Sequence, residues 1–340
     1  ALSVHEDAKK DSKSSKTGTE CVSLWKLMAS VVKSLDRDDS WWTANIGGGR
    51  DVFVGRTAVL SSYLVQSGFV ESAADGVQSH VIGASGTDGD PLSVLIDLIT
   101  TLLLVAGERD TRNGVASEKC AAFASALKES RLMGLPGVLY RLLCIENVSY
   151  DRSTPAELSS QLLHIVNQTL RLFNTLALVD KTLLEDCLKD EEMVVMLTHS
   201  FAVLLTWLCR MTDMDAMDLL LPRLLVAVGH FAAVSQRAQA LTVLGGQHSI
   251  VQQLCVLPFR YFSDPALMRL LFPTLIACCF RRPTAVSLLK QELSPKLLST
   301  FITEQSSSIE AQSTTVDAPA FANRFSKKLW PEAILFFESA

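Results

Sequence analysis

Histidine and cysteine are common zinc ligands, and their spacing in this chain decides whether they can share one zinc ion. His248 and Cys255 are seven residues apart, which is two turns of a helix, so one helical face could present both. A zinc site needs two further ligands. The sequence contains no C-x-x-C pair and no two histidines four residues apart. We therefore expect neither a metal ion nor a cofactor.

Acids, nucleophiles and glycine-rich loops also fail to form a catalytic motif. The stretch NIGGGRD (Asn45–Asp51) lacks the lysine and the Ser or Thr of a phosphate-binding loop, so it predicts a flexible loop. Asp97 lies in an apolar stretch and is the best candidate for a buried acid. It shares a helical face with Thr100 and Thr101, however, and this polar face favours exposure to solvent. These patterns predict a protein that is not an enzyme, with an unrecognised active site as the alternative.

Basic residues gather in the C-terminal third and are the remaining candidates for function. Arginine can hold a carboxylate or a phosphate with two parallel hydrogen bonds, whereas lysine offers a point charge. We expect these side chains to lie outside the core and to contact an acidic protein surface or an RNA phosphate, although an ordinary solvated face would look the same. The candidate partner-binding residues are Arg260, Arg281, Arg282, Arg324, Lys327 and Lys328.

Composition limits the class of protein further. The chain has 340 residues, of which 48% are apolar and 20% are charged, a balance typical of a folded protein with a large core. Its net charge of −5 excludes a global positive field that would attract nucleic acid, although a local basic patch remains open. The eight cysteines lie mostly in apolar helical patterns, which favours free thiols in a reducing, cytoplasmic compartment.

Local signals for helix starts occur several times. In STPAELSSQLLHIV, Thr154 is the expected N-cap, Pro155 occupies the first helical position and Glu157 completes a capping box. The acidic run Asp190–Glu192 precedes an apolar stretch, where a helix N-terminus favours negative charge. The apolar face predicted for the first of these helices consists of Leu158, Leu162, Ile165, Val166, Thr169 and Phe173.

The apolar segment Leu257–Cys279 contains three prolines and predicts short helices separated by breaks. A cap at Ser263 or Asp264 begins one helix, with Pro265 in its first turn. Pro273 lies within the same pattern, so we expect a kink at this position. The apolar stripe of this helix consists of Leu267, Leu270, Leu271, Leu275 and Cys278.

The whole pattern predicts an all-α fold. About a dozen helices of ordinary length, with no alternating strand pattern, favour an irregular armadillo/HEAT-like stack, that is, an α-solenoid. The stretch Leu241–Phe259 resembles one armadillo unit. We expect a disordered lead-in over residues 1–20 and one helical-repeat domain over residues 21–340, with flexible loops near 36–52, 75–90 and 304–320.

Two apolar runs raise the question of a membrane. Pro91–Gly107 and Met193–Cys209 both fall short of the about 20 residues that a spanning helix needs, and polar residues interrupt them. We therefore expect buried helices and no insertion of this region into a membrane.

Several stretches resemble one known family. The most specific is LCVLPFRYFSDPALMRLLFPTLIACC (Leu254–Cys279), and VAVGHFAAV (Val226–Val234), NQTLRLFNTLALV (Asn167–Val179) and FANRFSKKLWPEAILFF (Phe321–Phe337) agree with it. They are similar to the C-terminal helical region of the family of the S-phase cyclin A-associated protein residing in the endoplasmic reticulum. The resemblance extends from near residue 53 to the C-terminus and is modest before residue 150.

The resemblance implies a non-catalytic adaptor or scaffold. Members of the family associate with cyclin A and its kinase at the endoplasmic reticulum. They are also linked to ribosome-associated decay of tubulin mRNA, where they bridge a nascent-chain reader to a deadenylase complex. These links imply protein partners and a cytoplasmic location at the cytosolic face of the endoplasmic reticulum. The basic clusters of the C-terminal third separately suggest a contact with ribosomal RNA. The alternative is an RNA- or ribosome-binding module that acts mainly through a local basic patch.

Overall fold

In the computed structural model the described residues are 160–179, 181–210, 214–245, 249–311 and 324–340, with residues 97, 100, 137, 139, 140, 143, 144, 158 and 321. The chain divides into two compact units, Ala1–Met133 and Gly134–Ala340, and the helices described below belong to the second. The expected lead-in over residues 1–20 and the loops near 36–52 and 75–90 lie outside the described residues. One domain over residues 21–340 therefore stays a prediction.

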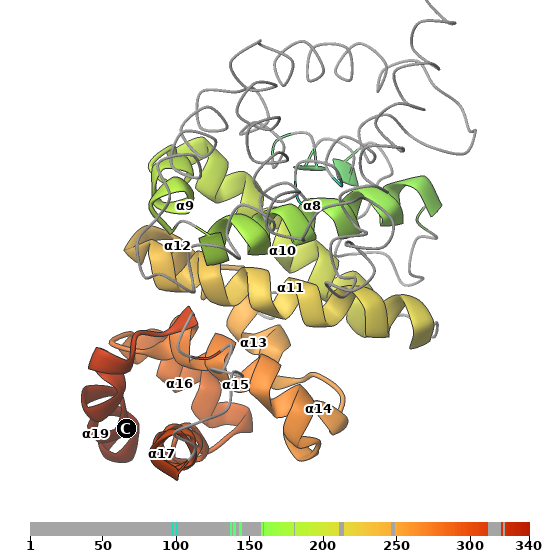
Figure 1. The fold of residues 1–340 in the computed structure, drawn as a ribbon. Coiled ribbons are helices and arrows are strands. Elements are labelled where there is room, and N and C mark those ends of the chain that lie inside the picture. The colour runs from blue at the N-terminus through green and yellow to red at the C-terminus, as the bar shows by residue number, and fades with distance from the viewer. Residues whose placement is uncertain are drawn as a thin grey trace, which may run out of the picture. The chain divides into compact units, whose positions relative to one another are not determined.

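Every element within the described ranges is a helix, which confirms the all-α prediction. The helices follow one another along the chain and pack together as a stack (Figure 1). In chain order they are α8 (Ser160–Val179), α9 (Lys181–Cys187), α10 (Glu191–Arg210), α11 (Met214–Val234), α12 (Gln236–Leu241), α13 (Ile250–Cys255), α14 (Arg260–Ser263), α15 (Pro265–Cys279), α16 (Pro283–Glu292), α17 (Lys296–Ala311), the 3-10 turn η4 (Lys327–Leu329) and α19 (Trp330–Ser339).

Helix α11 joins the earlier helices of this unit to the later ones. It packs against α8 and runs along α15 (Figure 1). Gly229 permits the close approach of α11 to α15, because a Cβ at this position would lie 2.9 Å from Thr274 Oγ1 and 3.1 Å from Arg324 Cδ. A larger residue at this position would force these neighbours to move.

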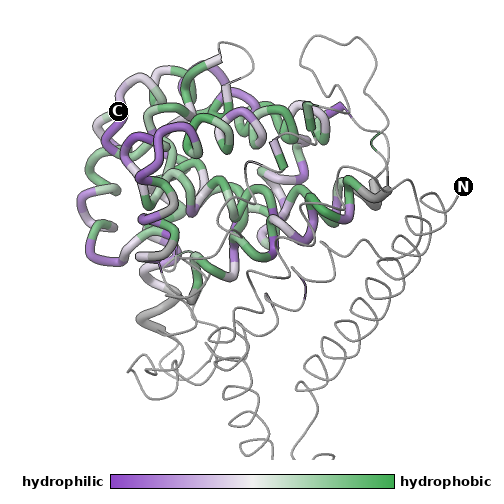
Figure 2. Tube along the Cα trace, turned by 90° about the horizontal axis from the view of Figure 1, so that it is seen from above, coloured by the Kyte–Doolittle hydropathy of each residue, from purple (hydrophilic) through white to green (hydrophobic). Residues whose placement is uncertain are grey.

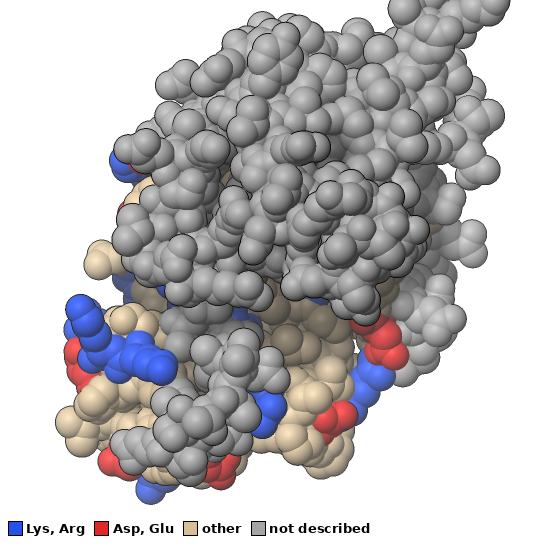
Figure 3. Space-filling model, viewed as in Figure 1, with Lys and Arg blue, Asp and Glu red and all other residues tan. Residues whose placement is uncertain are grey.

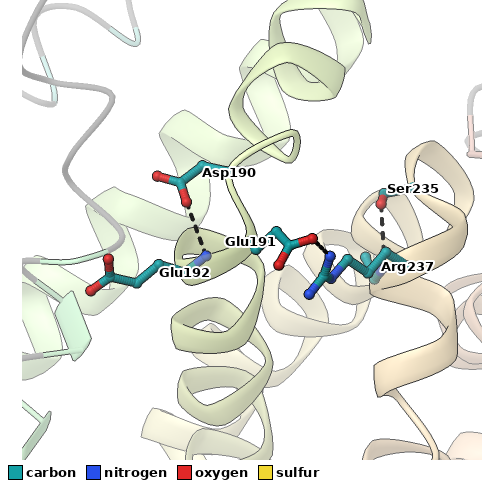
Figure 4. Close-up of polar contacts among 6 residues, drawn as sticks. Asp190, Glu191, Glu192, Ser235 and Arg237 are labelled. Carbon is teal, nitrogen blue, oxygen red and sulfur yellow. Dashed lines mark hydrogen bonds and ion pairs between the residues drawn. The ribbon is translucent and has the colours of Figure 1, made fainter.

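Helix α10 begins where the acidic run predicts. The Asp190 carboxylate accepts a hydrogen bond from the backbone N–H of Glu192 at 2.9 Å, and two glutamates lie in the first turn (Figure 4). Helix α12 begins in the same way, because the Ser235 hydroxyl accepts a hydrogen bond from the backbone N–H three residues later. Glu191 forms an ion pair with Arg237, which joins the starts of these two helices.

Helix α15 begins at Pro265, as predicted. Asp264 is its N-cap, because its carboxylate accepts a hydrogen bond from the backbone N–H of Ala266 at 2.8 Å. Pro273 lies inside the helix without ending it. The predicted apolar stripe is confirmed, since its members are buried or packed against the core: Leu267, Leu270, Leu271, Leu275 and Cys278.

A continuous apolar core extends through the described helices. Near its centre, Phe201 of α10 contacts Phe173 of α8 and Phe231 of α11 edge to face, with ring centroids 5.9 Å and 5.4 Å apart. Hydrophobic and hydrophilic stretches recur along each helix (Figure 2), as expected where one face of each helix is buried. The removal of this apolar surface from water is the main force that holds the stack together.

The start of α8 differs from the prediction. Leu158 is buried but not helical, and α8 begins at Ser160 rather than at Pro155. The expected cap at Thr154 lies outside the described residues. The phase of the helix is nevertheless correct, because the predicted face is buried at every position: Leu158, Leu162, Ile165, Val166, Thr169 and Phe173.

The loop predicted near residues 304–320 is wrong over its first part. Helix α17 continues through Ala311, so the serine-rich stretch that begins at Ser306 is helical. The hydroxyl of Ser306 donates a hydrogen bond to the carbonyl of Ile302 at 2.9 Å, and the hydroxyl of Ser307 repeats this contact one residue later at 3.1 Å. These serines are therefore satisfied within the helix and do not end it.

The position of Asp97 also corrects the prediction. Asp97 and Thr100 are the residues of the first unit that the structure describes, and both are helical. Asp97 exposes 9% of its surface and Thr100 exposes 0%, so these two members of the face that was expected to meet solvent are buried. Each of the two has an interaction partner within the chain, which is how folded proteins accommodate buried polar groups.

Two described helices are long and apolar enough, by length and composition alone, to cross a membrane. They are α10 and the part of α11 from Met217 to Val234, and 61% of each apolar window is buried inside the fold. Helix α10 is longer than the apolar run Met193–Cys209, because charged residues form its two ends. Core helices of folded proteins share these properties, so the two helices are weak evidence for a membrane.

Candidate functional site

A concave pocket of about 560 Å³ lies among α9, α11, α12, the end of α15 and the segment that precedes η4. Blue side chains gather on this side of the described surface, between α12 and α19 (Figure 3). We call it the basic pocket. Its charged and titratable lining residues are Lys181, Glu185, His230, Arg281, Arg282 and Arg324.

Arg281 lies at the rim of the basic pocket, directly after α15. Its guanidinium donates two hydrogen bonds to the carboxylate of Glu332 in α19, from Nε at 2.7 Å and from Nη2 at 2.6 Å. The hydrogen bond with Arg281 lowers the pKa of the Glu332 carboxyl. Both side chains are more than half exposed, at 59% and 51%, so water and salt compete with the pair and it contributes little to stability.

The backbone of Arg281 is left-handed, with φ of 57°. A residue with a Cβ rarely adopts this conformation, which costs about 1–2 kcal/mol. The conformation ends α15 in a tight turn, and it places consecutive arginines at the wall of the pocket, Arg281 beside α19 and Arg282 beside α12. Strained residues of this kind cluster at binding sites.

Arg282 reaches back to α12. Its Nε donates a hydrogen bond to Oε1 of Gln239 at 3.0 Å, and its Nη2 donates to the carbonyl of Gln236 at 2.7 Å. The amide of Gln239 donates in turn to the carbonyls of Ala277 and Phe280. This network ties α12 to the C-terminal end of α15, so it holds two walls of the basic pocket in a fixed position.

Arg324 lies in the core, which corrects the expectation that all six candidate side chains lie outside it. It exposes 2% of its surface. Its Nη2 donates a hydrogen bond to the carbonyl of Arg269 at 2.7 Å, and its Nη1 donates to the carbonyl of Leu270 at 2.8 Å. Pro273 has no N–H, so it cannot donate to the Arg269 carbonyl four residues earlier. The buried guanidinium supplies the missing donor.

Burial does not neutralise Arg324. Desolvation lowers its pKa to about 10, so the guanidinium remains charged at neutral pH. A third hydrogen bond, from Nη1 to Thr274 Oγ1 at 3.1 Å, holds it against α15. The positive charge therefore lies at a fixed position beneath the wall of the basic pocket.

The other three candidates are divided between two places. Lys327 and Lys328 lie exposed in η4, where they have no partner among the described residues and are close in the chain to the lining residues Ser326 and Leu329. Arg260 in α14 instead pairs with Asp218 of α11, and it does not line the pocket. All candidates except Arg260 therefore lie in or beside the basic pocket.

His230 of α11 is a functional candidate that the sequence did not single out. It lines the basic pocket, exposes 1% of its surface, and neither ring nitrogen has a hydrogen-bond partner among the described residues. Desolvation, with the charges of Arg324 and Lys181, lowers its pKa to about 3. The ring is therefore neutral at physiological pH and can still donate one hydrogen bond and accept another.

The burial of neutral His230 should make stability depend on pH. The unfolded chain binds a proton near pH 6.5 and the folded chain only near pH 3, so the free energy of unfolding falls as the pH drops below about 6.5. At pH 5 this loss should reach about 2 kcal/mol. Urea denaturation at pH 7 and pH 5 measures it, with His230→Gln as the comparison. Equal pH dependence of the wild type and the variant would show that His230 does not carry the effect.

The chemistry of the basic pocket is that of anion binding. Guanidinium and ammonium groups hold carboxylates and phosphates, and at neutral pH they are poor nucleophiles and bases. Within the part of the chain that the structure describes, no three His, Cys, Asp or Glu side chains gather to hold a metal ion. Cys255 is buried, and His248, seven residues before it, lies outside the described residues. The fold and this pocket define a class of protein, an all-α helical stack with a basic pocket at one edge.

Comparison with known proteins identifies one particular relative by sequence. The chain is similar to the human S phase cyclin A-associated protein in the endoplasmic reticulum, with 32% identity over 219 residues. The matched region is 60% of this chain and 15% of the human protein. The resemblance that the sequence indicated is thereby confirmed, while the partners and activity of the whole human protein are proposals for this chain. No protein-family profile matches the chain.

Proposed function

We propose that this chain is a non-catalytic adaptor, a helical stack that presents a basic edge to an acidic surface of a protein partner. The observation that carries the proposal is the gathering of Arg281, Arg282, Lys327 and Lys328 in and beside one pocket, although the overall charge is −5. The network from Arg282 to Gln239 supports a fixed geometry, which lowers the entropic cost of binding.

The name of the human relative suggests the partner and the place. It is associated with cyclin A in the endoplasmic reticulum, so we propose cyclin A or its kinase complex as the first partner of this edge, at the cytosolic face of that compartment. An armadillo-like solenoid is the form of helical stack that we propose. We propose the same adaptor role for this chain in the ribosome-associated decay of tubulin mRNA, which proceeds through a deadenylase complex.

Charge reversal in η4 tests the proposed edge. Lys327→Glu with Lys328→Glu should weaken binding to purified cyclin A–kinase complex by about tenfold or more, because two exposed cations become anions at the interface. The loss should shrink as salt rises, since exposed charges are screened. A salt series of pull-downs measures it.

The matched control is Lys290→Glu with Lys296→Glu, which changes the net charge equally at exposed positions of α16 and α17. Because exposed charges contribute about 0–1 kcal/mol to folding, both double variants should fold. If the control loses as much binding as the η4 variant, binding depends on the net charge and not on this edge.

The exposed lysines of η4 also favour a second candidate, a contact with RNA phosphate. Lys327 and Lys328 offer point charges of the kind that neutralise phosphates. A ribosome co-sedimentation assay with the same two double variants distinguishes the candidates. Loss of ribosome binding with unchanged binding to cyclin A would favour the RNA contact.

A further inference from the structure

The rim of the basic pocket already holds an anion that belongs to the chain itself. The carboxylate of Glu332 occupies both donors of the Arg281 fork, at 2.7 Å and 2.6 Å. We propose that the basic pocket binds an anionic side chain, a carboxylate or a phosphate, carried by a peptide segment of a protein partner, and that this group displaces Glu332 from Arg281. The proposal rests on the proposed adaptor function and names the chemistry that the basic edge recognises.

The charges of the pocket favour an incoming anion. Its lining contains the cations Lys181, Arg281, Arg282 and Arg324, and Glu185 is its acidic member. Glu332 neutralises Arg281 from the rim, so positive charge is still in excess among the described lining residues. Arg324 is 2% exposed and remains charged, so its charge lies in a low-dielectric surrounding. There its attraction for an anion is stronger than it would be in water. The site is therefore built for a negative group and is only partly neutralised by the chain.

The Arg281–Glu332 pair can be displaced at low cost. Both side chains are more than half exposed, so water replaces their contacts readily. The two residues are 51 positions apart and come from different segments, the turn after α15 and helix α19. A ligand that binds the fork of Arg281 more tightly than Glu332 does thus needs no rearrangement of a buried network.

Size and shape favour a peptide over an isolated ion. A volume of about 560 Å³ falls within the range of small-molecule pockets and far exceeds that of a single phosphate. Phe280, Phe325 and Ala232 line the pocket with apolar surface that could cover the stem of a side chain and its neighbours. Buried His230, with both ring nitrogens unpartnered among the described residues, offers a polar contact for a bound backbone or side chain.

The test uses the full chain and three oriented libraries of short peptides. Each library is degenerate except for a central residue, which is phosphoserine, glutamate or glutamine. The full chain should be retained by the phosphoserine library, the glutamate library or both, at least about tenfold more than by the glutamine library. The library with the stronger retention distinguishes phosphate from carboxylate.

Two variants, each with a control variant, test whether Glu332 and Arg281 determine the retention on the anionic libraries. Glu332→Gln removes the internal competitor and should increase binding to the anionic libraries several-fold, whereas Glu338→Gln, an exposed acid of the same helix, should not. A gain that is confined to the anionic libraries, with unchanged retention on the glutamine library, distinguishes this effect from the non-specific binding of a misfolded variant. Arg281→Gly should reduce binding about tenfold, and glycine suits the left-handed backbone at this position. Arg237→Ala, which removes an arginine outside the pocket, should leave binding unchanged.

Several outcomes would overturn the proposal. Equal retention on all three libraries would show that no anionic side chain is recognised. Unchanged binding in both Glu332→Gln and Arg281→Gly would show that recognition lies elsewhere. If either of these two outcomes occurs while the η4 charge reversal still abolishes binding to the cyclin A complex, the proposed adaptor edge stands and the proposed peptide pocket fails. If the η4 reversal has no effect but Glu332→Gln gains peptide binding, the pocket stands and the assignment of that partner fails.

Discussion

Replacement of Arg324 by alanine is expected to lower the free energy of unfolding by about 3–5 kcal/mol. The change leaves a cavity where a long side chain was packed, and it removes the donor that satisfies the Arg269 carbonyl at 2.7 Å. That carbonyl has no helical donor, because the residue four positions later is Pro273. Urea denaturation monitored by circular dichroism measures the loss.

A double-mutant cycle isolates this cause. Pro273→Ala restores an N–H that can donate to the Arg269 carbonyl, so the cost of Arg324→Ala should be about 1–3 kcal/mol smaller in that background. Pro222→Ala is the matched control, since Pro222 also lies inside a helix but in α11. The cost of Arg324→Ala should be the same with and without Pro222. Additive effects with Pro273→Ala would mean that the guanidinium stabilises the fold by packing alone.

Replacement of Leu271 by alanine is expected to destabilise the fold by about 2–5 kcal/mol. Leu271 exposes 0% of its surface and lies in α15, the helix that packs along α11. Truncation removes buried methyl groups and leaves a cavity that a close-packed core cannot fill completely. Thermal or urea denaturation measures the effect.

Leu335→Ala provides the comparison for this loss. Leu335 exposes 67% of its surface on α19, so its truncation should change stability by about 0.5 kcal/mol or less. The same chemical change is then made at a buried and at an exposed leucine. Similar unfolding midpoints for the two variants would mean that the apolar stripe of α15 is not the core of this unit.

Local sequence patterns were sufficient to predict the all-α class of fold and several helix boundaries. Asp264 caps α15 and the acidic run at Asp190 begins α10, as the local patterns predicted. Capping depends on residues two or three positions apart, and the apolar stripe depends on the period of the helix. Both are short-range properties, so a single chain is enough to find them. The resemblance of Leu254–Cys279 to a known family was visible for the same reason.

The tertiary structure decided which polar residues are buried and which meet. Arg324 was grouped with the lysines that follow it, yet the fold buries it beside Pro273, 51 positions earlier in the chain. The kink expected at Pro273 stays a prediction, and the missing N–H of this proline also indicates that some donor must satisfy the freed carbonyl. The residue that supplies the donor is far from Pro273 in the chain, so the sequence pattern around Pro273 does not identify it.

The candidate site required the same long-range information. Sequence indicated that Arg281 and Arg282 could bind an anion, but their contacts with Glu332 and Gln239 join segments more than 40 residues apart. His230 looked like any histidine of an apolar helix until the fold placed it at a charged pocket. Periodicity assigns a residue to one face of a helix, whereas the packing of separate helices decides whether that face meets core, solvent or a pocket, because burial depends on every neighbour at once.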